Sequence, residues 1–203
     1  MSKKKAEMPR REEFLKTALA RFSKVGYSAT STREICAEVG LVHSAIYNYF
    51  PSKEAVVLAI EAREMEKATR SLLEALEAAG SDPESRLVAA LTHIYEAAIA
   101  QQQAWRLMAD MIRSLKPANK QQVIKRRDEY QKIVFDVLSE ANEAKLITAP
   151  NLHLATLHVF GLAEGVAGWF RKDGPLKRTE TVADIARFAL QGLGAAPDVI
   201  MRL

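Results

Sequence analysis

The sequence has one cysteine, Cys36, and no apolar segment that approaches the roughly 18 residues needed to cross a membrane. A single thiol cannot form an internal disulfide, and a zinc site would need further ligands nearby, so Cys36 is expected to be a small core residue. The basic N-terminus, MSKKKAEMPRREE, has no apolar run behind it of the kind that a secretion signal requires. We therefore expect a cytoplasmic protein with no membrane span.

Glycine and proline are also scarce, with nine and seven among 203 residues, and they fall at a few joints. Almost no segment alternates with period two, whereas apolar residues recur at intervals of three and four. This pattern predicts an all-α fold. The expected helices cover about 10–25, 31–39, 42–50, a long stretch from 53, 83–100, 104–115, 118–144, 150–171 and 180–192.

Several helix ends carry recognisable signals. Gly26 is a candidate left-handed C-cap, and Ser31 with Glu34 has the spacing of a capping box, in which each side chain satisfies backbone donors of the first turn. Ser52 is placed to cap the long helix, and Asp82 followed by Pro83 favours a helix start. These signals set off three short segments before the first long helix.

Charge is unevenly distributed along the chain. Residues 1–53 hold ten Lys or Arg and five Asp or Glu, a net charge of +5, whereas the remainder holds 19 basic and 20 acidic residues, a net charge of −1. A basic first quarter on a neutral body is typical of an anion-binding module joined to a second part.

The stretch LVHSAIYNYFPSKE, from Leu41 to Glu54, follows a short helix and the break at Gly40. Two short helices joined by a tight turn and preceded by a packing helix are typical of a helix-turn-helix, whose second helix can enter the major groove of DNA. The alternative is a core helix with a solvated polar face. The residues expected to face inward are Ile35, Val39, Ile46 and Phe50, and those expected to face outward are His43, Ser44, Tyr47 and Asn48.

The segment GYSATSTREICAEVGLVHSAIYNYFPSKE resembles the DNA-binding signature of the TetR family of bacterial transcriptional repressors, over about the first 55 residues. The resemblance implies a DNA-binding domain at 1–54 and a ligand-binding and dimerisation domain at 55–203. It implies that Arg33, His43, Ser44 and Asn48 read base edges and that Ser31, Thr32, Tyr47, Tyr49 and Lys53 hold phosphates. Two positions depart from the family pattern: Val42 stands where the family usually has Ser or Thr, which removes an N-cap, and Cys36 replaces a usual Ala.

Three glycines, Gly161, Gly165 and Gly168, share one face of the helix expected at 150–171. Glycine destabilises a helix by about 1 kcal/mol relative to alanine, so three together indicate close approach of another backbone. With Phe188, Leu190 and Leu193 of the last helix they suit a two-fold, four-helix interface, which is where members of the family dimerise. The alternative is close packing within one chain.

Bulky apolar side chains on the middle helices could line a ligand pocket, although each alone is more often plain core. The expected ligand-binding residues are Trp105, Met108, Tyr130 and Trp169, with Arg126 and Arg127 as anchors for an acidic group. The alternative for the run Lys125-Arg126-Arg127 is a solvated face, which is the usual role of such runs. Similar apolar surface comes from Met111, Ile112, Phe135, Phe160 and Phe170, and positive charge near helix ends from Arg106 and Arg113. The later half, from KRRDEY to FALQGL, is similar to the TetR branch that governs fatty acid and steroid breakdown. That resemblance implies an acyl-CoA thioester as effector.

An enzyme is the competing class. A di-iron bundle needs two inward Glu-x-x-His pairs, and this chain has none; its histidines, at 43, 93, 153 and 158, form no ligand-spaced cluster. No phosphate loop or nucleophile elbow occurs either. A helical adaptor that binds only protein would leave the basic first quarter unexplained. We expect a homodimeric, ligand-responsive repressor of double-stranded DNA operators, without metal, cofactor or enzymatic activity.

Overall fold

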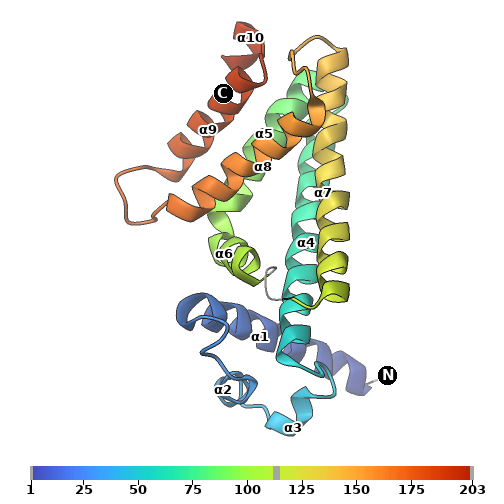
Figure 1. Ribbon diagram of the computed structural model, residues 1–203, viewed down its shortest axis with the longest axis vertical. Helices are drawn as coiled ribbons and strands as arrows, with labels where there is room; N and C mark the ends of the chain where they lie inside the picture. The colour runs from blue at the N-terminus through green and yellow to red at the C-terminus, as the bar shows by residue number, and fades with distance from the viewer. Residues whose placement is uncertain (1, 112–114, 202–203) are drawn as a thin grey trace. The chain divides into compact units, whose positions relative to one another are not determined.

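The computed structural model describes the backbone of residues 2–111 and 115–201, and the side chains from residue 10 onward apart from 106 and 108–111 within those ranges. Over these residues the chain is helical with no strand (Figure 1). The helices are α1 (Ser2–Val25), α2 (Thr32–Glu38), α3 (His43–Ile46), α4 (Lys53–Ala78), α5 (Pro83–Ala100), α6 (Gln102–Met111), α7 (Pro117–Glu143), α8 (Leu152–Trp169), α9 (Arg178–Gly192) and α10 (Pro197–Ile200).

The all-α prediction is confirmed, and the structure differs from the predicted helices at α1, α3 and α10. Helix α1 begins at Ser2 rather than near residue 10, and the terminal α10 was not foreseen. Helix α3 is a single turn instead of two. It lacks a side-chain cap at Val42, and Pro51 disfavours helical geometry in the residue before it, so residues 47–49 form a turn.

The predicted cap signals are present. Ser31 and Glu34 form a complete capping box, and Gly26 closes α1 with a φ of 96°. The Ser52 hydroxyl accepts a hydrogen bond from the Ala55 N–H at 3.1 Å, and the Asp82 carboxylate accepts one from the Ser85 N–H at 2.9 Å. Local sequence therefore sets the starts of α2, α4 and α5.

The chain divides into two compact units. Unit 1 comprises Met1–Met65 and Gln103–Lys125, and unit 2 comprises Glu66–Gln102 and Arg126–Leu203. Helices α4 and α7 each contribute their first part to one unit and the rest to the other. Unit 1 therefore contains more than the first helices of the sequence.

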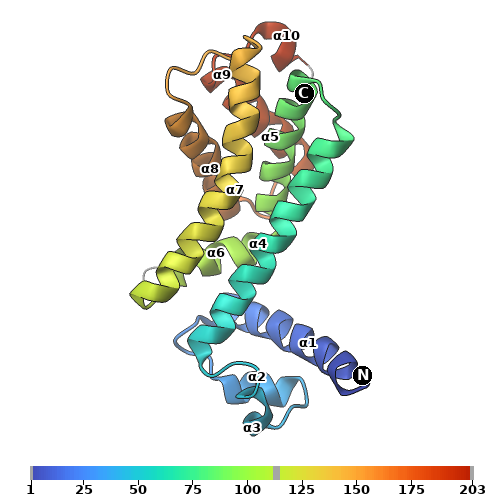
Figure 2. The ribbon, with the colours of Figure 1, turned by 90° about the vertical axis from the view of Figure 1, so that its right-hand side faces the viewer.

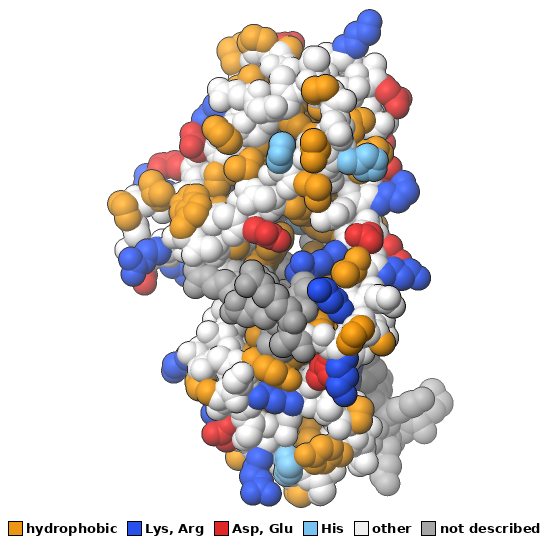
Figure 3. All heavy atoms as spheres, viewed as in Figure 1, with side chains coloured by type: hydrophobic (Ala, Val, Ile, Leu, Met, Phe, Trp, Pro, Cys, Tyr) orange, Lys and Arg blue, Asp and Glu red, His pale blue; other side chains and the backbone are white. Residues whose placement is uncertain are grey.

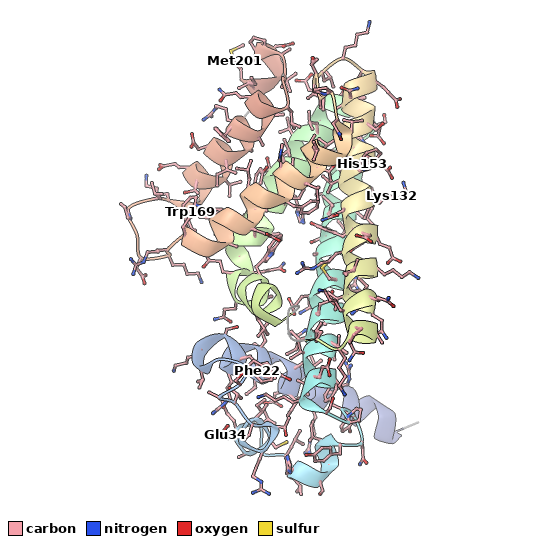
Figure 4. The ribbon with its side chains drawn as sticks, viewed as in Figure 1. Phe22, Glu34, Lys132, His153, Trp169 and Met201 are labelled. Atoms are coloured by element: carbon pink, nitrogen blue, oxygen red, sulfur yellow. The ribbon has the colours of Figure 1, made fainter. Side chains whose placement is uncertain are left out.

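Unit 1 is built around one apolar core. Phe22 lies on the inner face of α1 (Figure 4), and its ring meets that of Tyr27 with centroids 5.4 Å apart. Leu107 of α6 joins the same core although it follows α4 by many residues. The core residues are Phe14, Leu15, Ala18, Phe22, Ile35, Cys36, Ile46, Phe50, Val56, Val57, Ile60 and Leu107. Cys36 is buried there, as predicted.

In unit 2, α5 packs against α8 and α9, and α9 against α10 (Figure 2). Ion pairs tie α5 to its neighbours: Arg86 meets Glu140 of α7 at 2.8 Å, and Arg178 of α9 meets Glu96 at 2.9 Å. Among the described residues no helix is long and apolar enough to span a membrane.

Candidate nucleic-acid interface

The turn between α2 and α3 fixes the first candidate site. Gly40 has a φ of 64°, a left-handed conformation that glycine adopts without strain. The next amide, Leu41 N–H, donates to the Cys36 carbonyl at 2.8 Å, which closes the end of α2. The chain then enters α3 at His43. This is the helix-turn-helix that the sequence predicted, with a shorter second helix.

The start of α2 is rigid. The Glu34 carboxylate accepts from the Ser31 backbone N–H at 2.8 Å and from its hydroxyl at 3.0 Å. These hydrogen bonds, the backbone one first, hold the pKa of Glu34 below its ordinary value. Arg21 of α1 pairs with Glu38 at 3.0 Å and lies 3.7 Å from Glu34. The capping box and Arg21 together hold α2 against α1, with Glu34 at its edge (Figure 4).

The inward and outward faces of α3 agree with the prediction. Ile46 is 1% exposed and Phe50 is 4% exposed, and the Phe50 ring stacks on that of Phe14 with centroids 5.7 Å apart. On the opposite side Tyr47 is 52% exposed, and Asn48 is exposed too. Ser44 is also exposed, while His43 and Tyr49 are half-buried. The aromatic cluster of this stretch thus serves both as core and as surface.

His43 is held in place by neighbours on both sides. Its Nε2 lies 3.1 Å from the Thr32 hydroxyl, and its ring meets the Tyr47 ring edge-on with centroids 5.1 Å apart. Thr32 and His43 begin α2 and α3 respectively, so this contact sets the spacing between the two helix starts. Sequence reasoning placed both residues at the interface but did not foresee the contact.

Lys53 does not project as a free cation. Its ammonium donates to the Tyr27 backbone carbonyl and lies 4.1 Å from the centroid of the Tyr27 ring. Burial lowers the pKa of Lys53, partly offset by Glu34. An ammonium has three N–H donors, so a phosphate contact by Lys53 stays a prediction. Spacing alone gave no sign of the Tyr27 contact.

Positive charge surrounds this end of unit 1. Arg33 is exposed on α2, and Arg10 is exposed on α1. The guanidinium of Arg11 lies 5.1 Å from the Phe50 ring centroid, a cation–π contact that sequence reasoning missed. Figure 3 shows Lys, Arg and His side chains among apolar ones at the end formed by α2 and α3. The surface combines exposed hydrogen-bonding groups on α3 with basic groups beside it, as a duplex DNA contact requires.

The three glycines of α8 are exposed along one line of the helix. Within the described residues, a Cβ at Gly161 or Gly168 would meet nothing within 4 Å, and at Gly165 it would meet only Trp169 Nε1, at 4.0 Å. The alternative of close packing within one chain is therefore wrong. Phe188 is 62% exposed, whereas Leu190, which was expected to share the interface, is fully buried in unit 2.

An open groove of about 600 Å³ runs between α8 and α9. Its walls are mostly apolar, and Leu154 and Leu157 beside it are each about half exposed. Gly161 and Phe188 also line it. The remaining lining residues are Ala149, Pro150, Asn151, Ala155, His158, Val159, Leu162, Ala189, Gly192 and Leu193.

The predicted ligand residues fall at separate places. Trp105 is half-buried in unit 1, and the Met108 side chain lies outside the described residues, as do those of Arg106, Met111, Ile112 and Arg113. In unit 2, Tyr130 is 6% exposed with its ring 5.7 Å from that of Phe160, and burial raises its pKa. Arg126 and Arg127 are half-buried. Trp169 is 51% exposed at the end of α8 (Figure 4). A pocket combining these residues stays a prediction.

Two family profiles match the chain in succession. Residues 14–60 match the profile described as "Bacterial regulatory proteins, tetR family", and residues 80–193 match "Tetracyclin repressor-like, C-terminal domain". The chain belongs to the TetR family. It is therefore a helix-turn-helix transcriptional regulator that binds DNA, and α2 and α3 are its DNA-binding motif.

Individual relatives match to different extents. The regulator YuxN of Bacillus subtilis is 35% identical over 82 residues, which are 40% of this chain and 28% of YuxN. The transcriptional activator FasR of Mycolicibacterium smegmatis is 26% identical over 193 residues, 93% of this chain and 84% of FasR. The solved complex of AibR with isovaleryl coenzyme A and operator DNA has a TM-score of 0.79 at 20% identity, covering 92% of this chain and all of that one, which establishes the shared fold.

Proposed function

We propose that this TetR-family regulator is a homodimeric repressor that binds a palindromic operator and is released by an acyl-CoA thioester. The observation that carries the proposal is that the chain has two exposed surfaces of different character. One is the α2–α3 face with Arg33, Ser44 and Asn48, and the other is the apolar face of α8 and α9 with its three unfilled glycine positions.

On the DNA, Arg33, His43, Ser44 and Asn48 read base edges, because they offer donors and acceptors on α2, on α3 and in the turn that follows α3. Ser31, Thr32, Tyr47, Tyr49 and Lys53 hold phosphates. A subunit with a one-turn reading helix covers few base pairs. Two subunits related by a two-fold axis read a palindrome with its halves about one helical turn, or a multiple, apart on one face of the DNA.

The α8–α9 groove supports a second copy of the chain as its occupant. Gly161, Gly165 and Gly168 leave room for another backbone, and Phe188 supplies an exposed apolar anchor beside them. A two-fold pairing places each Phe188 against the partner's groove and builds a four-helix contact from α8 and α9 of both subunits.

The effector class is supported by a similar fold and by the aromatic middle helices. AibR, which has this fold, was solved with isovaleryl coenzyme A. Here the buried Tyr130 and Phe160 rings provide apolar surface, and Arg126 and Arg127 provide positive charge for a phosphate-bearing head. An amphipathic thioester matches both. A hundredfold drop in operator affinity requires about 2.7 kcal/mol of preference for the released conformation.

A titration of the protein on labelled duplex DNA tests this function. Fluorescence anisotropy with the promoter region beside its own gene is expected to show tight binding that a long-chain acyl-CoA reverses, while the free acid and CoA alone do not. An Arg126→Ala/Arg127→Ala variant should keep operator binding and lose the release. Release by uncharged hydrophobic drugs, with no response to any thioester, would point to a regulator of drug efflux instead. Failure to bind any promoter fragment would favour the protein-only adaptor.

The direction of control is tested separately, because FasR is an activator. In transcription from the bound promoter with purified polymerase, a repressor lowers the amount of transcript and an acyl-CoA restores it. A rise in transcript on adding the protein would make it an activator.

A further inference from the structure

Glu54 lies beside Lys53 at the start of α4, but its carboxylate accepts hydrogen bonds from residues at the start of α7. Its Oε1 accepts a hydrogen bond from the Lys116 backbone N–H and another from the Asn119 side-chain amide, each at 2.9 Å. Lys116 immediately precedes Pro117, the first residue of α7. Backbone N–H groups at the start of a helix have no acceptor within the helix, so an acceptor from outside is favourable for the Lys116 N–H. Glu54 therefore caps the start of α7 from α4.

The electrostatics favour this contact. The N-terminus of a helix carries a partial positive charge, which attracts a carboxylate. The hydrogen bonds from Asn119 and then Lys116 lower the pKa of Glu54, and so does the Lys116 charge. The two donors to Glu54 lie 62 and 65 residues further along the chain, so the contact joins distant segments.

Other contacts hold the same later segment, 103–125, within unit 1. The Ser23 hydroxyl of α1 donates to the Gln103 carbonyl at 3.2 Å, and the Leu107 side chain of α6 is buried in the core with Phe22. Leu107 and Ser23 act at the α1 side. Glu54 acts at the other side, one residue from Lys53 and hence beside the DNA-binding motif.

We propose that Glu54 is a positioning residue that links the DNA-binding motif to the start of α7, so that a change at the start of α7 alters operator affinity. The proposal rests on the proposed function for the effector, but the link itself is defined by the contacts. Breaking it leaves the helix-turn-helix core intact and frees the start of α7 from α4. Effector binding and operator binding then become less dependent on each other.

Three variants of the full chain separate the acceptor from its charge. Glu54→Ala removes the acceptor, Asn119→Ala removes one donor, and Glu54→Gln keeps an acceptor oxygen without the charge. Lys120→Ala, an exposed neighbour on α7, is the matched control. The first readout is the hydrogen-exchange rate of the Lys116 amide by NMR, and the second is the ratio of operator Kd with and without palmitoyl-CoA.

We expect Lys116 exchange to rise by about tenfold or more in Glu54→Ala, to be largely restored in Glu54→Gln and to be unchanged in Lys120→Ala. The Kd ratio should fall at least about fivefold in Glu54→Ala and Asn119→Ala, with effector-free Kd within about threefold of the parent. Unchanged Lys116 exchange in Glu54→Ala overturns the link, and faster exchange with an unchanged ratio overturns its role in coupling.

The proposed effector can fail independently. If the parent protein does not respond to palmitoyl-CoA, operator DNA alone serves as the ligand, because coupling is reciprocal. Operator binding is then expected to slow Lys116 exchange in the parent and in Lys120→Ala but not in Glu54→Ala, which has no acceptor for the Lys116 N–H. An equal effect of the operator in all three proteins overturns the proposal.

Discussion

Lys53 shows how one side chain can be occupied before any ligand arrives. Its ammonium lies over the Tyr27 ring and bonds the Tyr27 carbonyl. We expect Lys53→Met to lower the free energy of unfolding by about 1 kcal/mol, because the cation–π contact and hydrogen bond are lost while burial of the charge partly offsets them. Urea denaturation measures this, with the exposed Lys24→Met as control.

The predicted phosphate contact of Lys53 is tested by the salt dependence of operator binding. If stability is unchanged and the slope of log Kd against log salt falls by about one, Lys53 contacts a phosphate in the complex.

Substitutions of base-reading residues and of phosphate-holding residues should have different effects in binding assays. Asn48→Ala is expected to cost about 1 to 3 kcal/mol on the operator and to relax base preference, as is Arg33→Ala, because each removes donors to base edges. Tyr47→Phe removes a hydroxyl expected to bond a phosphate and should weaken all duplexes nearly equally. Competition with operators changed one base pair at a time distinguishes the two patterns. Asn48→Ala with normal affinity and preference would mean that α3 is oriented differently on the DNA.

Sequence patterns were informative for residues whose role is local. The facing of Ile46 and Phe50 followed from spacing, and the hydroxyl of Ser31 was recognised as a cap from its distance to Glu34. The contacts of Lys53 with Tyr27 and of Glu54 with Asn119 join residues 26 and 65 positions apart. Such contacts depend on the packing of whole helices, which no local pattern encodes.

At the scale of a helix, the start of α2 depends on its capping box. Ser31→Ala removes the acceptor for the Glu34 N–H, which lies 3.2 Å from the hydroxyl, and is expected to lower stability by about 1 kcal/mol. Thermal or urea unfolding of the full chain measures the change, and Ser28→Ala, exposed in the preceding turn, is the control. Equal stability of the two variants would show that Arg21 alone suffices to hold α2.

The same helix starts predict a dependence on pH. The pKa of Glu34 and of Glu54 lies below the ordinary 4.5 in the folded chain because each carboxylate accepts hydrogen bonds. A depressed folded pKa means that these groups stabilise the fold fully above pH 4.5 and lose that effect as the pH falls through the folded values. Unfolding followed from pH 6 to 3 should show a smaller decline for Glu54→Gln than for the parent; an identical decline would contradict the role of Glu54.

Helix prediction worked where periodicity and a predicted cap agreed, as at α5. It overestimated α3, because the apolar spacing of residues 42–50 fits two turns whereas Val42 cannot cap the start and Pro51 limits the end. The helix predicted at 104–115 corresponds to α6, which is described as far as Met111; residues 112–114 lie outside the described part, so the predicted end at 115 stays a prediction.

At the scale of the whole molecule, α8 and α9 are expected to carry subunit pairing. Gly165→Leu should split the dimer and abolish operator binding, since a second backbone needs the space that the glycine leaves, while within the described part of the subunit the nearest atom outside the adjoining helix backbone is Trp169 Nε1, 4.0 Å from the new Cβ. Sedimentation measures the assembly, and Ala144→Leu, exposed in the turn after α7, is the control. A Gly165→Leu protein that stays dimeric places the interface elsewhere.

The motif at 26–54 was enough to predict the family and the fold. The positions of the ligand and dimer sites within residues 55–203 could not be predicted in the same way. Aromatic residues such as Trp105 and Trp169 have the same spacing whether they line a pocket, fill a core or face solvent. Trp169 proved half exposed, and Trp105 belongs to a different compact unit from Tyr130. Only tertiary packing separates these outcomes.

The presence of Leu107 and Asn119 in the same unit as the helix-turn-helix bears on how this protein can be recombined. A fragment ending at residue 65 lacks Leu107 of the apolar core and both donors to Glu54, and one ending at residue 54 also lacks Val56, Val57 and Ile60. We expect such a fragment to fold poorly by itself. In a hybrid that joins residues 1–65 to the rest of another family member, the segment that corresponds to 103–125 would come from the other protein. Exchanging 103–125 together with 1–65 should preserve operator recognition, so the transferable cassette is discontinuous in the gene.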